Sequence, residues 1–209
     1  MAYTLASTVT EIRALINEDV ADYWSDSEIQ NWIKEGVLDW CAKSLLYMRH
    51  DTITLATDTQ EYTASGSSYI SNALRTLHAD YEGRALQRIS YEQINKHNAR
   101  ALGGDDEPYF FFDHYNGTTL TFYIGPTPTA TYNSETVNVV FACRTDDITA
   151  IPWEYQPTVF LYAAHKAKFK ERQYQEAYLY YQQYINNIVF SRADNINRGV
   201  QTTDAFKVI

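Results

Sequence analysis

The sequence predicts an α+β protein: a helical bundle of four main helices, two N-terminal and two C-terminal, with an inserted small antiparallel β module and an extended C-terminal arm. Apolar residues recur every three or four positions in 1–50 and 152–192, as on one face of a helix. They alternate with polar residues in much of 51–151, as in half-buried strands. Neither period holds in 193–209. We therefore expect a helical domain (1–50 and 152–192), a β-rich module (51–151) and an arm (193–209).

The composition limits the classes of function. The chain has 209 residues, 45% of them apolar, with 18 tyrosines and a formal net charge of −9. It is long enough to bury a core without disulfides. Binding to phosphate needs clustered Lys and Arg, so the acidic balance argues against a general nucleic-acid-binding protein.

The sequence also indicates where the protein is made. No apolar run approaches the roughly eighteen residues that cross a bilayer, and the N-terminus lacks a signal-peptide pattern. Cys41 and Cys143 fall on apolar positions of a helical and a strand pattern, which favours buried free thiols over a disulfide. We expect a protein made in a reducing cell interior, without a membrane partner.

Two helices are expected in the first fifty residues. Thr8 with Glu11, and Ser25 with Glu28, have the spacing of capping boxes, in which each side chain satisfies a free amide of the first turn. The second helix is the longer, running from Trp24 to about Met48. Its predicted buried face is formed by Ile29, Trp32, Ile33, Gly36, Val37, Trp40, Cys41, Ser44, Leu45 and Met48.

The middle of the chain reads as strands and turns. Residues 51–57 alternate, and Tyr109–Tyr115 with Thr118–Ile124 flank Asn116-Gly117, the pair that best tolerates a type I′ hairpin turn. A last strand places Val137, Val139, Phe141 and Cys143 on one face. Ser90 and Gln93 form a weaker capping box that predicts a short helix to about Leu102.

Helical spacing returns at Pro152, a residue suited to a first turn. The helix that follows has a face of small residues around Ala163, Ala164 and Ala167, which permits close packing. The next helix, about 173–190, carries two apolar–aromatic stripes, more than one packing partner requires. Tyrosine combines a large contact area with a polar tip, which suits an interface formed after folding. The suspected subunit or partner interface is Tyr174, Tyr178, Tyr181, Tyr184, Phe206, Val208 and Ile209.

Several runs of the chain are similar to a known family. They are Thr10-Glu11-Ile12-Arg13-Ala14-Leu15-Ile16, Trp24-Ser25-Asp26-Ser27-Glu28-Ile29, Trp32-Ile33, Gln60-Glu61-Tyr62, Gly83 with Leu86, Gly125-Pro126 with Pro128, Ile151-Pro152 with Glu154-Tyr155, and Ala163-Ala164 with Lys166-Ala167. Together they resemble head-to-tail adaptor (connector, or head-completion) proteins of tailed bacteriophages, over most of 8–190.

The resemblance implies a structural protein of the virion neck, assembled in the host cytoplasm. It implies a ring of about twelve copies beneath the portal protein, which extends the DNA channel and docks a downstream tail or nozzle protein. It also implies that the C-terminal arm engages the portal, and that DNA passes without specific binding. An acidic channel wall would repel phosphate, which agrees with this last point.

Catalytic motifs do not stand out. The best candidate is Asp105, Asp106 and Glu107 with Asp113 and His114, which could bind a divalent metal, although a solvated loop is the favoured interpretation. The five histidines lack metal-binding spacing, and no phosphate loop, CxxC pair or nucleophile elbow is present. We therefore expect no enzyme, no cofactor and no metal.

Other interpretations stay open at this point. The run Tyr109-Phe110-Phe111-Phe112 could stack a sugar or a base, although core and subunit packing are favoured. The Lys166–Arg172 cluster could touch DNA, although a solvated helix end or a rim of salt bridges to an acidic neighbour is favoured. The alternative to a ring adaptor is a tail-associated module that binds carbohydrate or another partner through the β insertion. A metal-dependent hydrolase is the least favoured.

Overall fold

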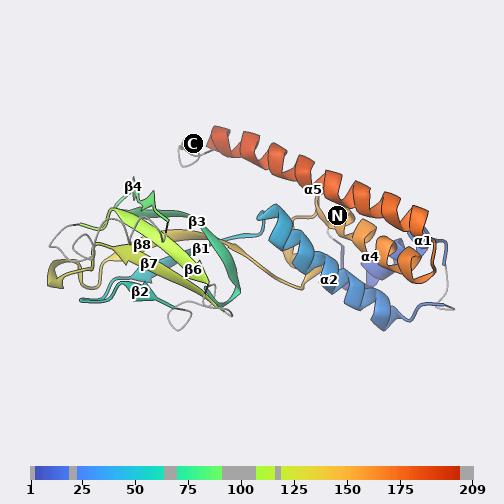
Figure 1. Cartoon of the computed structure of the whole chain (residues 1–209), viewed down its shortest axis with the longest axis horizontal. Helices are drawn as coiled ribbons and strands as arrows, with labels where there is room; N and C mark the ends of the chain where they lie inside the picture. Colours follow the sequence, from blue (N-terminus) through green and yellow to red (C-terminus); the bar gives the residue numbers. More distant parts are fainter. Residues whose placement is uncertain (1–2, 19–22, 64–69, 91–106, 116–118, 203–209) are drawn as a thin grey trace. The chain divides into compact units, whose positions relative to one another are not determined.

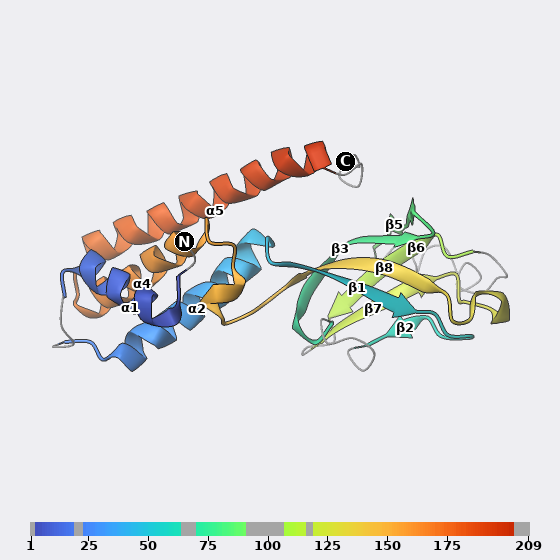
Figure 2. The same ribbon diagram turned by 180° about the vertical axis from the view of Figure 1, so that it is seen from behind.

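The structure is a computed structural model, and it describes residues 3–18, 23–63, 70–90, 107–115 and 119–202, with side-chain surroundings up to 193. The chain forms two compact units. The helical unit comprises the chain up to Tyr47 and again from Arg144, and the β unit comprises Met48–Cys143. Figures 1 and 2 show the helices of the first unit and the strands of the second from opposite sides.

The helical unit is grouped around α4 (Gln156–Lys170). This helix packs against α1 (Leu5–Ile16), α2 (Asp26–Ser44) and α5 (Tyr174–Thr202), and both views show α5 running alongside it (Figures 1 and 2). A Cβ on Gly36 of α2 would lie 2.9 Å from the Tyr162 ring, so the glycine allows α4 to approach closely. The predicted small face of α4 is confirmed, since Ala163, Ala164 and Ala167 are fully buried.

The helix caps explain where the first two helices begin. The predicted capping box of Ser25 and Glu28 is confirmed, because each side chain bonds the other residue's backbone amide. The predicted start of the first helix at Thr8 is wrong. Thr4 is the cap and Ser7 its reciprocal partner, so the helix begins at Leu5 and Thr8 is buried inside it. Both boxes have the same spacing, and the sequence alone did not select the one that forms.

The turn between α4 and α5 contains a strained residue. Arg172 has φ 63°, the left-handed region that favours glycine, and its amide donates to the carbonyl of Phe169 while that of Gln173 donates to Lys168. A Cβ in this region costs about 1–2 kcal/mol.

Arg172→Gly should therefore raise the free energy of unfolding by up to about 1 kcal/mol. Urea denaturation followed by tryptophan fluorescence measures it. The control is Gln175→Gly, which places a glycine inside an exposed helical turn and should destabilise by a similar amount. Destabilisation by both changes would contradict the assignment of strain to Arg172.

The described residues of the β unit form two four-stranded sheets. The first has the order β1 (Met48–Thr54), β8 (Thr136–Cys143), β3 (Ala73–Tyr81) and β4 (Arg84–Ala85). The second has the order β2 (Glu61–Tyr62), β7 (Leu120–Gly125), β6 (Phe110–Tyr115) and β5 (Gln87–Arg88). Three 3₁₀ turns occur in the described chain: η2 (Ile70–Asn72) and η4 (Ala130–Tyr132) here, and η5 (Ile148–Ala150) in the helical unit.

The two sheets share an apolar core. Phe122 of β7 and Phe141 of β8 are fully buried, with ring centroids 6.2 Å apart and nearly perpendicular planes. Ile53, Leu55, Leu120, Ile124, Val137 and Val139 are buried in the same unit.

A polar clasp also joins the sheets. Asp113 of β6 accepts a 2.7 Å bond from the Thr76 amide of β3 and pairs with Arg88, whose guanidinium donates to the Thr76 carbonyl at 2.6 Å. Thr76 borders an irregularity in the β3–β8 pairing, where β3 has one extra residue. Its backbone groups are therefore paired across the sheets.

The predicted fold class is wrong in its topology. The chain has four α-helices in its described part and two four-stranded sheets, not a four-helix bundle with a small antiparallel module. The second sheet is mixed, because β5 pairs with β6 in parallel. The C-terminal arm is not extended from 193, because α5 continues to Thr202. A helix already stabilised by packing propagates at little cost per residue, which explains the extension.

Irregular pairing makes the burial pattern of β3 depart from simple alternation. Two register shifts, between Ala73 and Arg75 and between Thr76 and His78, interrupt its alternation. The buried positions become Ala73, Thr76, Ala79 and Tyr81, a spacing of three and two.

Two other predictions for the strands are confirmed. The hairpin is confirmed as an antiparallel pair with Tyr115 opposite Leu120, and the last strand is confirmed as β8. The turn at Asn116-Gly117 and the short helix after Ser90 lie outside the described residues. No described helix combines the length and apolar character needed to cross a membrane.

Both cysteines are buried and neither forms a disulfide, as predicted. Burial raises the pKa of the Cys41 thiol to about 11. Because the thiolate is the reactive form, a thiol reagent should not modify the native protein at about pH 8, whereas both cysteines should react in concentrated guanidinium chloride. A colorimetric thiol assay with and without denaturant measures this. Rapid reaction of the native chain would contradict the buried placement.

Candidate interaction surface

The described part of the long helix α5 carries very little charge. Among residues 174–193 only Glu176 and Arg192 are charged, whereas charged residues make up 21% of the chain. Tyrosine, glutamine and asparagine dominate the rest. Depletion of charge together with enrichment of aromatic residues is typical of protein–protein contacts.

Within residues 174–193 of α5, five large apolar or aromatic side chains are more than half exposed. At 3.6 residues per turn they lie on two sides of the helix, about 120° apart. The first flank consists of Tyr174, Tyr178 and Val189, and the second flank of Leu179 and Phe190. Phe190 is the most exposed, at 72%.

The first flank continues onto α4. Phe169 is 55% exposed, and its ring lies 5.4 Å from that of Tyr174 in an edge-to-face arrangement. His165 lies 6.0 Å from Phe169 and 5.0 Å from Tyr181 between ring centroids. An aromatic strip therefore follows the α4–α5 seam from the turn toward the core.

The structure separates the tyrosines that the sequence grouped as one interface. Tyr174 and Tyr178 are exposed, and Tyr181 is half-buried against His165. Tyr184 is fully buried, and its hydroxyl donates a 2.7 Å hydrogen bond to Asp39 of α2. Its side chain thus packs within the chain. Phe206, Val208 and Ile209 lie outside the described residues.

Burial, followed by the bond to Asp39, raises the pKa of Tyr184 far above its usual value, so the phenol stays protonated as a donor. Tyr184→Phe should therefore lower the free energy of unfolding by about 1–3 kcal/mol, because Asp39 loses a hydrogen bond and keeps only its ion pair with Lys43. Urea denaturation measures it. The matched control, Tyr174→Phe, should change stability by less than about 0.5 kcal/mol. Equal losses of stability in the two variants would show that the Tyr184 hydroxyl does not make a stabilising hydrogen bond to Asp39.

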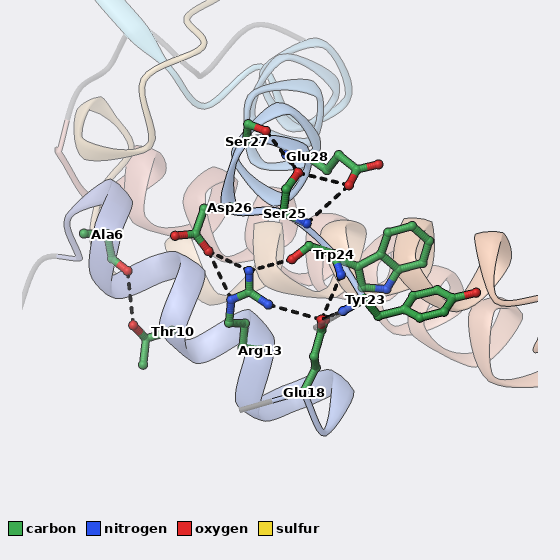
Figure 3. Close-up of polar contacts among 10 residues, drawn as sticks. All are labelled: Ala6, Thr10, Arg13, Glu18, Tyr23, Trp24, Ser25, Asp26, Ser27 and Glu28. Carbon is green, nitrogen blue, oxygen red and sulfur yellow. Dashed lines mark hydrogen bonds and ion pairs between the residues drawn. The ribbon is translucent and has the colours of Figure 1, made fainter. Parts of the chain in front are cut away.

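A polar network shapes the connection between α1 and α2 (Figure 3). Arg13 is buried, and its guanidinium donates to Asp26 at 2.6 Å and to the Trp24 carbonyl at 2.7 Å. Glu18 lies 3.4 Å from the same guanidinium and accepts bonds from the amides of Tyr23 and Trp24 at 2.7 and 2.8 Å. The network fixes the backbone that presents Tyr23, which is 67% exposed.

The basic cluster at the end of α4 is engaged within the chain. Lys170 lies over the rings of Trp24 and Trp32, at 5.5 and 5.0 Å from their centroids, and 3.5 Å from Glu28. Hydrogen bonds from Ser25 lower the pKa of Glu28, and Lys170 adds to this. Lys166 pairs with Glu35, and the buried Lys168 pairs with Glu171. These ion pairs agree with the favoured interpretation of the cluster rather than with a DNA contact.

The other candidates from the sequence do not come together as a site. Asp105 and Asp106 lie outside the described residues, Glu107 pairs with Arg84, and Asp113 belongs to the clasp between the sheets. Across the described ranges, no three His, Cys, Asp or Glu side chains are grouped so that they could hold a metal ion. Phe110, Phe111 and Phe112 are all buried, which leaves Tyr109 as the only exposed ring of that run.

Sequence reasoning missed three exposed residues of this surface, Phe169, Leu179 and Phe190, and also the exposed Tyr23, which precedes α2. Each falls off the main apolar stripe of its segment or outside a regular element. For Leu179 and Phe190 the available signal was the near absence of charge along 174–190, where Glu176 is the single charged residue; Tyr23 and Phe169 have charged neighbours in the sequence and no such signal.

Comparison with known proteins gives one family. A family model described as SU10 adaptor protein matches residues 3–203, which is nearly the whole chain. No curated protein matches the sequence.

Proposed function

We propose that this chain, which belongs to the SU10 adaptor protein family, forms a ring beneath the portal protein. The family match confirms the resemblance to phage head-to-tail adaptors. As a phage adaptor it is a structural component of the virion. The proposed ring contains about twelve copies, extends the DNA channel and provides the surface on which the tail docks. It acts at the virion neck, without catalysis or a cofactor.

The observation that carries the proposal is the family match across 3–203. The nearly uncharged aromatic surface of α5 supports it, because a ring subunit needs a surface that associates with other chains. The net charge of −9 supports passage of DNA without binding, since an acidic protein does not attract the phosphate groups of DNA. The burial of the Phe110–Phe112 run removes the main support for a carbohydrate-binding module.

Electron microscopy of the purified chain, alone and mixed with portal particles of the same phage, tests the proposal. Closed rings, or a new collar on the portal particles, are the expected results. A chain that neither forms rings nor binds the portal would overturn it.

The role of the C-terminal residues has its own test. Deleting 203–209, which removes Phe206, Val208 and Ile209, should abolish portal binding and leave the melting temperature unchanged. The control replaces the same segment with a Gly/Ser sequence of equal length, which should also fail to bind. Binding by either variant would assign portal contact to another part of the chain.

A further inference from the structure

The two flanks of α5 present a geometric problem for any single partner. The first flank (Tyr174, Tyr178, Val189) and the second flank (Leu179, Phe190) lie on different sides of one helix. A rigid partner docked on one flank leaves the other in water. Single exposed apolar residues are normal on a protein surface, but several on one helix indicate an interaction site.

The charge of the chain indicates which partner fits. Each copy carries a net charge of −9, so two copies repel each other wherever charged surfaces approach. Residues 174–193 hold one acidic and one basic residue, which makes this stretch a neutral surface on an acidic protein. A second copy of the chain can therefore approach here without repulsion, and it brings both flanks with it.

The proposed ring determines the symmetry of the contact. In a two-fold contact, residue i of one copy meets residue j of the other and the reverse, so the contact closes at two copies. In a head-to-tail contact one surface meets a different surface, and the arrangement repeats until it closes. Because the proposed ring has more than two copies, only the second arrangement builds it from one repeated contact.

We propose that neighbouring copies of this chain contact each other head to tail through α5, with the first flank of one copy packed against the second flank of the next. This inference rests on the proposed ring function and specifies its subunit contact. Phe169 extends the first flank, since its ring lies against Tyr174 and is 55% exposed.

Two variants of the full chain test the contact. One carries Tyr174→Glu with Tyr178→Glu, and the other carries Leu179→Glu with Phe190→Glu. The control, Asn187→Glu with Ala42→Glu, adds the same charge at exposed positions outside both flanks. Circular dichroism first verifies that all three fold, which is expected because every substituted side chain is exposed.

Sedimentation velocity then measures self-association, and electron microscopy measures collar formation on portal particles. Each flank variant alone should weaken assembly by about tenfold or more, whereas the control should assemble like the original chain. An equimolar mixture of the two flank variants should form pairs but no rings, because one copy's intact first flank meets the other's intact second flank.

The outcomes separate the inference from the function on which it rests. If the original chain forms neither rings nor a portal collar, the proposed function fails. If it assembles and the flank variants assemble equally well, the ring stands and the α5 contact is overturned. If both variants fail and their mixture forms no pairs, the contact is not head to tail, and the inference is again overturned.

Discussion

Replacing Arg13 with leucine should lower the free energy of unfolding of the helical unit by about 3–5 kcal/mol. The Arg13 side chain is only 8% exposed and lies 3.4 Å from Glu18, whose own side chain is 13% exposed. Removing the guanidinium leaves the Glu18 carboxylate buried without its cation, and leaves the Trp24 carbonyl without its 2.7 Å donor. An uncompensated buried charge is the main cost.

Urea denaturation followed by tryptophan fluorescence suits this measurement. All four tryptophans, Trp24, Trp32, Trp40 and Trp153, belong to the helical unit, so the signal reports that unit. The control is Asp26→Asn, which removes the other acidic partner of Arg13. Because the Asp26 side chain is 64% exposed, its loss should cost about 1 kcal/mol or less. Comparable losses of stability in the two variants would contradict the assignment of Arg13 to a buried ion pair.

Replacing Phe122 with alanine should destabilise the β unit by about 3–5 kcal/mol. Phe122 is fully buried, its ring lies 5.6 Å from Phe111 in the same sheet, and 6.2 Å from Phe141 in the other. Alanine leaves a cavity between two sheets whose strands are fixed by pairing, so the surroundings cannot close on it fully.

Hydrogen exchange read by mass spectrometry measures this effect, since the β unit contains no tryptophan. Exchange of the amides in β7 and β8 should accelerate by about a hundredfold or more if they open by unfolding of the unit. Tyr115→Ala is the control, because Tyr115 is an aromatic residue of β6 that is 40% exposed. It should cost about 1 kcal/mol or less. Unchanged exchange in the Phe122 variant would show that the two sheets do not share this core.

Local signals in the sequence were sufficient wherever one short segment decided the outcome. The capping box of Ser25 and Glu28 defines the start of α2, and the alternation of 137–143 defines β8. The hairpin around residues 115–120 was predicted with its antiparallel pairing. The predicted start of α1 was wrong because Thr4 and Thr8 both have the spacing of a capping box. In the folded chain the box at Thr4 is the one that forms.

For the interaction surface, the sequence indicated the helix but not which of its sides is free. Periodicity placed Tyr174, Tyr178 and Tyr184 on apolar stripes of one helix, but a stripe does not reveal whether a neighbour covers it. The neighbour is α2, whose Asp39 accepts a hydrogen bond from the Tyr184 hydroxyl, whereas Tyr178 is 59% exposed.

The sequence by itself determined the types of most elements, the buried face of α2, the burial of both thiols and the family to which the chain belongs. These depend on residues close together in the chain, or on motifs spread along it. Only the tertiary structure decided the order of the strands, the irregular pairing of β3 and the division of the α5 tyrosines between core and surface. Those features depend on which distant segments pack together, and periodicity carries no information about the partner.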